Sequence, residues 1–229
     1  MAVAENVALV KERIESALER AGRKPGDVRI VAVTKTATVE TARELLQNGI
    51  THLGENRSNE FLHKYAAIGK EATWHFIGTL QSRKVKDIID YADYIHSLDR
   101  LSLAREIDKR AKRPVPCFVQ VNISKESTKH GILEEETLPF IEKLAQYPNI
   151  KVEGLMTIAP YTEDRGLIRS VFRRLKKLQE TVQRQSYPFA PCKELSMGMS
   201  NDFEIAVEEG ATFVRIGTLL VGENKGVRR

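Results

Sequence analysis

The stretch VRIVAVTKTATVETARELLQNG, Val28 to Gly49, sets the pattern for the whole chain. Its first six residues, Val28 to Val33, are mostly apolar and β-branched, which predicts a strand. The segment from Thr38 to Gly49 carries apolar residues at helical spacing and has a glycine where a helix would end. Lys35 lies between the two. The stretch therefore predicts one strand–helix unit with a lysine where the strand ends.

The same unit recurs along the rest of the sequence. Further strands are expected at 51–55, 73–78, 94–99, 115–123, 150–158, 193–198 and 213–222. The intervening helices are expected at about 58–67, 81–92, 100–112, 134–147, 164–185 and 200–210, and one more precedes the first strand at about 4–22.

Eight strands alternating with helices indicate βαβ units and a parallel sheet. The chain has no linker-like tract, and 229 residues suit one (β/α)8 TIM barrel, whose usual size is about 250 residues. An open doubly wound sheet is the competing architecture, but no GxGxxG follows the first strand. We expect a single α/β domain over 1–229, with the N-terminal helix at about 4–22 and the barrel at about 28–222.

The composition is that of an ordinary globular protein, with 41% hydrophobic and 29% charged residues. No apolar run approaches the ~20 residues that span a bilayer, and the acidic N-terminal segment does not resemble a signal peptide. We therefore expect a cytoplasmic protein without membrane contact. The isolated Cys117 and Cys192, and five histidines without ligand spacing, predict neither a disulfide nor a metal site. A net charge of +5 without a block of like charges does not favour nucleic-acid binding.

In a barrel the active site lies at the C-terminal ends of the strands, and phosphate often binds after strands 7 and 8. Here "SMGMS" stands at the end of the seventh strand and offers small residues and the Ser200 hydroxyl at a helix start. "RIGT" belongs to the eighth strand segment and offers Gly217 and Thr218. Together they predict a phosphate-binding cup, although Ser200 taken alone is more often an ordinary helix N-cap.

Opposite such a phosphate-binding cup, Lys35 becomes a candidate for binding another group of the same ligand. A lysine at a barrel mouth can form a Schiff base with a carbonyl when it is partly buried among apolar walls. An aldehyde at one end and a phosphate at the other describe pyridoxal 5′-phosphate. The alternative is a plain surface lysine, the commonest fate of this residue.

Arg215 stands two residues before Gly217, so both positions face the same side of the strand, into the barrel. A buried arginine needs an acceptor. A pyridine nitrogen would serve, and an internal ion pair with Glu153 or Glu55 would serve equally well.

These residues resemble the pyridoxal 5′-phosphate homeostasis proteins, which have the alanine-racemase-type barrel. The resemblance rests on "AVTKT", "GEN", "WHFIGTLQSRK", "GLMTI" and "LSMGMSNDFEIAVEEGATFVRIGT", in order from about Val28 to Gly222. It implies pyridoxal 5′-phosphate as the cofactor and Lys35 as its Schiff-base lysine. The other site residues it implies are Asn56 and His75 near the cofactor, Ser200, Gly217 and Thr218 at the phosphate, Met199 with its backbone N–H, and Arg215 at the pyridine nitrogen.

The resemblance also implies a protein that holds, buffers and delivers the cofactor, with apo-forms of cofactor-dependent enzymes as recipients, rather than a catalyst. Racemases of this barrel type take a second base from an additional β domain, for which the chain leaves no room after its last strand, so we expect a monomer without racemase turnover. The alternatives are a pyridoxal phosphate-dependent amino-acid racemase or lyase, and a barrel that binds another phosphorylated ligand. Lys129 is either a second amine that accepts the aldehyde or a loop lysine in water, and the tail "ENKGVRR" differs from the lysine-bearing tail of some family members.

Overall fold

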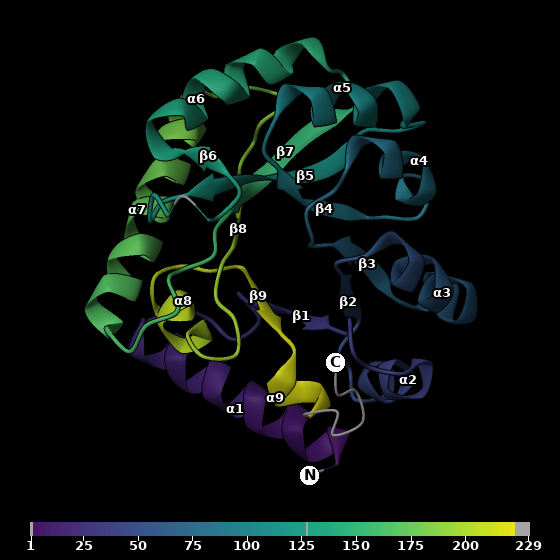
Figure 1. Ribbon diagram of the computed structural model, residues 1–229. Helices are drawn as coiled ribbons and strands as arrows, with labels where there is room; N and C mark the ends of the chain where they lie inside the picture. Colours follow the sequence, from purple (N-terminus) through teal and green to yellow (C-terminus); the bar gives the residue numbers. More distant parts are fainter. Residues whose placement is uncertain (1, 127, 223–229) are drawn as a thin grey trace.

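A closed barrel of eight parallel strands forms the centre of the molecule (Figure 1). The computed structural model describes residues 2–126 and 128–222, so the tail "ENKGVRR" lies outside the described residues. The barrel strands are β1 (Arg29–Val33), β2 (His52–Glu55), β3 (Thr73–Phe76), β4 (Tyr94–Leu98), β5 (Val115–Asn122), β7 (Ile150–Met156), β8 (Glu194–Ser196) and β9 (Phe213–Ile216). They pair in the order β4-β3-β2-β1-β9-β8-β7-β5, and a further β4–β5 pairing closes the ring. The predicted (β/α)8 barrel is confirmed.

The helices surround this ring. They are α1 (Val3–Arg20), α2 (Val39–Gln47), α3 (Ser58–Ile68), α4 (Val85–Ile88), α5 (Leu101–Arg110), α6 (Glu134–Lys143), α7 (Arg165–Arg184), α8 (Phe203–Glu208) and α9 (Thr218–Val221). α7 shows why they form: Asp164 caps its first turn by accepting from the Leu167 N–H, and one apolar stripe, including Phe172 and Leu175, is buried.

The structure differs from the sequence prediction at the expected helix 81–92. A 3₁₀ turn (Ser82–Lys84) and the single turn of α4 stand there instead. The helix ends early because Asp93 is tied to the start of β3, where its carboxylate accepts from the Trp74 N–H at 2.8 Å and its own N–H donates to the Trp74 carbonyl at 2.9 Å. These two bonds pull the chain out of helical geometry.

Two smaller differences concern chain segments near the barrel mouth. A short strand, β6 (Ile132–Leu133), pairs with the end of β5 outside the ring; two residues are too few to give a recognisable pattern. The expected last strand, 213–222, is divided at Gly217 into β9 and α9. This division places the N-terminus of α9 at the mouth of the barrel.

The N-terminal helix holds the last two units in place. Figure 1 shows α1, in purple, alongside α8 and α9. Arg13 donates two hydrogen bonds to Glu204 of α8, each 3.2 Å long, and the Asn6 amide donates to the Leu220 carbonyl of α9 at 3.1 Å. α1 thus supports the helices that follow β8 and β9. None of the described helices combines the length and apolar character that crossing a bilayer requires.

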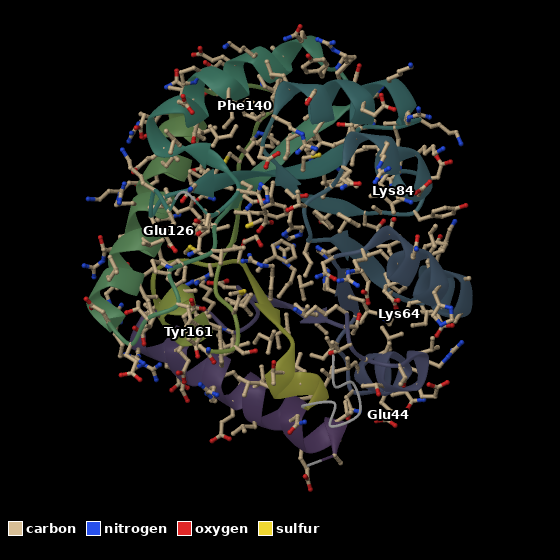
Figure 2. All side chains as sticks on the ribbon, in the orientation of Figure 1. Glu44, Lys64, Lys84, Glu126, Phe140 and Tyr161 are labelled. Atoms are coloured by element: carbon tan, nitrogen blue, oxygen red, sulfur yellow. The ribbon has the colours of Figure 1, made fainter. Side chains whose placement is uncertain are left out.

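Side chains fill the interior of the barrel (Figure 2). A small apolar cluster of Val31, Phe118, Met156 and Phe213 lies inside the ring, separate from the larger core between strands and helices. At the N-terminal end of the barrel, Arg29 pairs with Glu194 at 2.5 Å and lies 4.0 Å above the Phe213 ring. This end is therefore closed by a paired cation, and the opposite end carries the predicted site.

Candidate functional site

Lys35 lies in an exposed turn directly after β1. The turn is closed by a hydrogen bond of 2.9 Å from the Ala37 N–H to the Thr34 carbonyl. Partial burial between apolar walls was expected for Lys35, but the structure exposes the side chain while burying its neighbour Thr34. The amine is therefore accessible from solvent at the barrel mouth.

A buried ion pair supports the turn from below. The Lys64 ammonium of α3 donates to the Glu55 carboxylate at 2.8 Å and to the Thr34 carbonyl at 2.9 Å, and the Thr34 hydroxyl donates to the same Glu55 oxygen at 2.5 Å. These contacts fix the peptide group that immediately precedes Lys35. Sequence reasoning missed Lys64, although its place between Phe61 and Ile68 on the buried face of a helix was a usable signal.

Asn56 is half-buried where the chain leaves β2. Gly78, which follows β3, passes so close that a Cβ there would lie 2.3 Å from the Asn56 carbonyl oxygen. Only glycine permits this approach, so Gly78 helps to set the place of Asn56 at the mouth.

The loops after β8 and β9 meet as expected. The Arg215 N–H donates to the Gly198 carbonyl at 2.9 Å, which joins the two segments. Gly198 has φ +92°, and a Cβ there would lie 2.5 Å from the Ala206 Cβ, so the chain turns sharply against α8. The backbone N–H groups of Ser200, Gly217 and Thr218 have no hydrogen-bond partner within the described part of the chain. We call these three free N–H groups, on the two joined loops, the polar cup; phosphate binding by them stays a prediction.

Met199 and Ser200 differ in detail from the expectation. The Met199 N–H is not available for a ligand in this structure because it donates to the Asp202 carboxylate at 2.5 Å. Ser200 is not the N-cap of α8, since that helix begins at Phe203 and Asp202 occupies the cap position. Burial raises the pKa of Asp202, against the opposing effect of the Met199 amide.

Arg215 is buried inside the barrel with 4% of its surface exposed. Its Nη1 donates to the Ser196 hydroxyl at 2.6 Å and its Nη2 to the Thr157 carbonyl at 2.9 Å. Both acceptors are uncharged. Burial lowers the pKa of Arg215 to about 10, with Asp202 acting in the opposite direction, so the guanidinium remains protonated at neutral pH.

The ion pair considered for Arg215 does not form. Glu153 pairs with Lys151 at 2.9 Å and Glu55 with Lys64 at 2.8 Å. A guanidinium has five N–H donors, and two of those on Arg215 are used, so three remain without a partner among the described residues. A buried cation with spare donors is an unusual arrangement that calls for an acceptor.

His75 lies deeper than its expected place near a cofactor ring. It is fully buried in the barrel interior between His52 and His96, and it reaches Arg215 only through His96 and Ser196. Burial, reinforced by the neighbouring His96, holds the pKa of His75 well below its ordinary value of 6.5. The structure therefore connects His75 to the site through other side chains.

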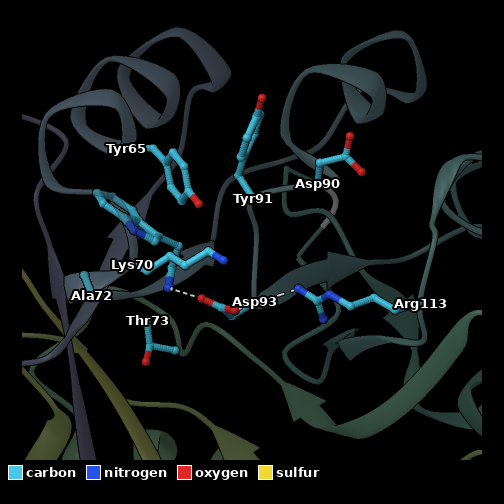
Figure 3. Close-up of a pocket in the computed structure, with 9 residues that line it drawn as sticks. Tyr65, Lys70, Ala72, Thr73, Asp90, Tyr91, Asp93 and Arg113 are labelled. Carbon is cyan, nitrogen blue, oxygen red and sulfur yellow. Dashed lines mark hydrogen bonds and ion pairs between the residues drawn. The ribbon is translucent and has the colours of Figure 1, made fainter.

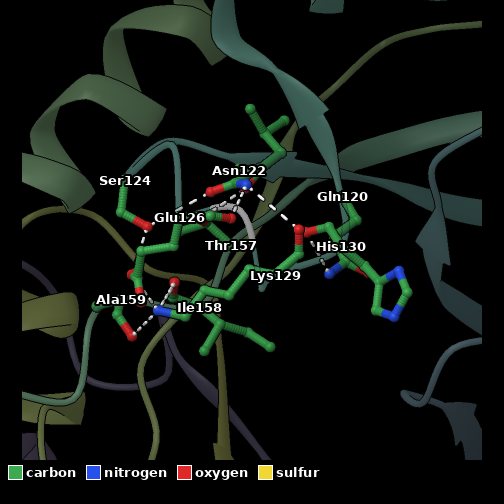
Figure 4. A network of polar contacts seen from close by, with 10 residues as sticks. Gln120, Asn122, Ser124, Glu126, Lys129, His130, Thr157, Ile158 and Ala159 are labelled. Atoms are coloured by element: carbon green, nitrogen blue, oxygen red, sulfur yellow. Dashed lines mark hydrogen bonds and ion pairs between the residues drawn. The ribbon is translucent and has the colours of Figure 1, made fainter.

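Lys129 lies in the loop after β5, where its ammonium is hydrogen-bonded to neighbouring protein atoms (Figure 4). Its ammonium donates to Glu126 at 2.6 Å and to the Ala159 carbonyl at 3.0 Å. The Asn122 amide in turn donates to the Glu126 carbonyl at 2.9 Å. The lysine thereby links the loop to the segment that follows β7.

A surface pocket of about 470 Å³ lies at the other end of the barrel (Figure 3). Tyr65, Trp74 and Tyr91 line it, together with Asp93, which pairs with Arg113 at 3.8 Å. Trp74 lies in the first half of β3, and Asp93 and Arg113 precede β4 and β5, so the pocket is at the N-terminal ends of the strands. Barrel chemistry is located at the opposite ends, so the mouth around Lys35 remains the candidate site.

The structure is a barrel with a lysine after its first strand and a polar cup after its last two strands. Comparison with known proteins identifies the family to which this barrel belongs. Residues 5–225 match the family model described as alanine racemase, N-terminal domain, and the chain belongs to that family. Within it, the chain belongs to the pyridoxal phosphate homeostasis proteins. It is 46% identical to the homeostasis protein of Aquifex aeolicus over 98% of this chain and 100% of the relative, and 38% identical to that of Pseudomonas aeruginosa over 96% and 95%.

Solved structures show the same fold. A Bifidobacterium adolescentis protein described as unknown superimposes with a TM-score of 0.92 at 32% identity, covering 95% of this chain and 94% of that one. PipY of Synechococcus elongatus with pyridoxal phosphate (PLP) bound gives 0.84 at 31% identity, covering 96% and 100%. The alanine racemase of Corynebacterium glutamicum gives 0.73 at 15% identity, covering 99% of this chain and 62% of that one, which supports the fold alone.

Proposed function

We propose that this protein binds pyridoxal 5′-phosphate at the barrel mouth and serves as a reversible holder of the cofactor. Lys35 holds the aldehyde end as a Schiff base, Ser200, Gly217 and Thr218 hold the phosphate, and Arg215 faces the pyridine nitrogen. Asn56 and the backbone around Met199 border the bound molecule. The relatives named as homeostasis proteins, and PipY with the cofactor bound, support the choice of ligand.

The observation that carries the proposal is the set of unused donors on Arg215. A buried guanidinium with neutral acceptors and three free N–H groups among the described residues suits an acceptor that carries no proton and no positive charge. An unprotonated pyridine nitrogen is such an acceptor. The cup of free N–H groups suits a phosphate, and the Lys35 amine suits an aldehyde. The donors present thus fit all three polar ends of the cofactor.

The bound cofactor supplies an aldehyde carbon that condenses reversibly with a primary amine, releasing water. Lys35 is exposed, so incoming amines and water can reach the bond and exchange it. Arg215 would donate to the ring nitrogen and keep it unprotonated, which weakens the ring as an electron sink. An unprotonated ring suits holding, but racemases of this barrel type share that arginine, so the arginine alone does not decide between holding and turnover.

From this we infer a non-catalytic role: buffering the free aldehyde and passing it to apo-enzymes that need it, as a monomer in the cytoplasm. An amino-acid racemase or lyase is the alternative function. It predicts steady turnover of an amino acid that disappears in Lys35→Ala.

The test is an absorption spectrum of the purified protein mixed with pyridoxal 5′-phosphate, before and after borohydride, followed by mapping of the modified lysine. We expect a Schiff-base band that borohydride removes, with the label on Lys35. Lys35→Ala should lose this band, whereas Lys86→Ala, an exposed lysine on α4, should keep it. A band that persists unchanged in Lys35→Ala refutes the assignment, and racemisation or elimination in an amino-acid screen would favour the enzyme.

A further inference from the structure

Three histidines form a hydrogen-bonded row through the barrel interior that ends at Arg215. His52 Nδ1 lies 2.9 Å from His75 Nε2, and His75 Nδ1 lies 2.8 Å from His96 Nε2. His96 Nδ1 lies 2.9 Å from the Ser196 hydroxyl, which also receives Arg215 Nη1 at 2.6 Å. Each of the two inner rings thus uses both of its nitrogens.

The direction of the row follows from Arg215. A guanidinium can only donate, so Ser196 Oγ accepts from it. The Ser196 hydroxyl proton then goes to His96 Nδ1, the other partner of that oxygen within the described residues. His96 therefore carries its own proton on Nε2 and donates to His75 Nδ1. By the same reasoning His75 is protonated on Nε2 and donates to His52 Nδ1. Every donor points away from Arg215.

The rings are also held in orientation and kept neutral. His75 stacks on Tyr94 with 4.7 Å between centroids, and His96 stacks on Phe118 at 4.3 Å. Burial lowers the pKa of both His75 and His96 well below the ordinary value, and Arg215 adds to the effect on His96.

Charges at the far end of the row act in the same direction. His52 is half-buried, and its pKa is lowered by burial and then by Arg29, with Asp93 opposing. A cation at each end of the row, Arg215 and Arg29, disfavours a third positive charge between them. Because all donors run in one sense, each hydrogen bond polarises the next.

We propose that Ser196, His96 and His75 are positioning residues that aim Arg215 without cancelling its charge. This role rests on the proposed function, in which Arg215 faces the pyridine nitrogen. A carboxylate in place of Ser196 would hold the guanidinium equally firmly but would neutralise it. A neutral, directed row holds the Nη1 edge of Arg215 in place, beside the Thr157 carbonyl that holds Nη2, and leaves the charge and the remaining donors for the ligand. The row thereby selects a ligand that presents an unprotonated acceptor, because a second positive charge beside Arg215 is disfavoured.

The first test is histidine ¹⁵N NMR on the chain without cofactor, with the exposed His63 as reference. We expect His75 and His96 to be neutral and protonated on Nε2. A proton on His96 Nδ1 would mean that the row points towards Arg215, and it would overturn the proposal. This measurement needs no variant, so the proposal stays falsifiable if a variant fails to fold.

The second test compares two buried serine-to-alanine changes in the barrel wall, Ser196 on β8 and Ser97 on β4. Ser196→Ala removes the link to Arg215, whereas Ser97→Ala removes a buried hydroxyl that has no partner among the described residues. Loss of a hydrogen bond to a charged group should weaken cofactor binding roughly tenfold or more in Ser196→Ala and shift the absorption band. Ser97→Ala should leave affinity and band unchanged, and Ser196→Thr, which keeps the hydroxyl, should retain both.

The outcomes separate this proposal from the function on which it rests. Wild-type affinity and an unshifted band in Ser196→Ala would overturn the positioning role while leaving the cofactor assignment intact. Absence of cofactor binding in the unmutated chain would refute the proposed function and with it the role of the row, whereas the tautomers would still report the direction of the hydrogen bonds.

Discussion

The ammonium of Lys64 and the carboxylate of Glu55 are paired at 2.8 Å in the layer between β2 and α3, and their side chains are 2% and 0% exposed. Lys64 is labelled in Figure 2, on the inner side of α3. Two charges taken out of water are stabilising only if their remaining polar atoms are also satisfied. Thr34 supplies part of this, with a carbonyl for Lys64 and a hydroxyl for Glu55 Oε1, while the buried Glu55 Oε2 has no hydrogen-bond partner among the described residues. The pair is therefore part of the support for the turn that carries Lys35.

Removing one member of this pair should be costly. We expect Lys64→Met to lower the free energy of unfolding by about 3–5 kcal/mol, because it leaves the Glu55 charge buried and uncompensated. The double variant Lys64→Met/Glu55→Met should recover much of this loss. Urea denaturation measures both, with the exposed Lys86→Met as control. Equal losses in the single and double variants would contradict the prediction.

Gly198 offers a prediction about the polar cup. Alanine there would have φ +92° and a Cβ 2.9 Å from the Phe203 Cα and 2.5 Å from the Ala206 Cβ. We expect Gly198→Ala to lower the free energy of unfolding by about 2–4 kcal/mol, the sum of backbone strain and a forced shift of α8. Cofactor affinity should fall with it.

Gly26 is the matched control because it has φ +88°, yet a Cβ added there would have no atom within 4 Å. Gly26→Ala therefore introduces backbone strain without a steric contact, and it should lower the free energy of unfolding by about 1 kcal/mol. Thermal denaturation of both variants separates strain from contact. If both variants lower the free energy of unfolding by the same amount, the contact between the added Cβ and α8 does not contribute to the loss, which would contradict the prediction.

The buried histidines make stability depend on pH. His75 and His96 are neutral in the fold because burial lowers the pKa of each well below 6.5. Below pH 6.5 the unfolded chain binds protons that the folded chain does not, so the free energy of unfolding falls as pH falls. Each histidine contributes about 1.4 kcal/mol per pH unit between 6.5 and its folded pKa.

Urea denaturation between pH 7.5 and pH 5 is the measurement for this effect. His63→Gln, at an exposed position on α3, should leave the slope unchanged. An unfolding free energy that stays constant over this range would show that the two rings accept protons in the folded state.

Lys129 allows a prediction about dynamics. Its ammonium connects the loop after β5 to the Ala159 carbonyl and to Glu126. We expect Lys129→Met to speed amide hydrogen exchange around Asn122 and Ala159 while changing global stability by less than about 1 kcal/mol. Lys125→Met, which breaks only an exposed pair with Glu135, is the control. Unchanged exchange would mean that the loop is held by its backbone alone.

Much of the site's location could be predicted from the sequence because barrel topology converts order along the chain into position. Once eight strand–helix units are recognised, right-handed parallel connections place the residues after each strand on one rim. Lys35 follows β1, Ser200 follows β8 and Gly217 follows β9, so their place on the same rim of the barrel needed no coordinates. The prediction of one helix over 81–92 was wrong because helical periodicity contains no information about a tertiary hydrogen bond such as that between Trp74 and Asp93.

The strand and helix periods, the barrel they imply and the residues at its mouth all follow from the amino-acid sequence, because they depend on local side-chain spacing and on connection rules. The partners inside the barrel follow only from tertiary packing: Lys64 with Glu55, and Arg215 with Ser196 instead of a carboxylate. His96 and Ser196 are separated by 100 residues yet share a hydrogen bond. Which inward-facing side chains touch depends on the stagger of the closed sheet, a property of the whole ring that no single segment contains.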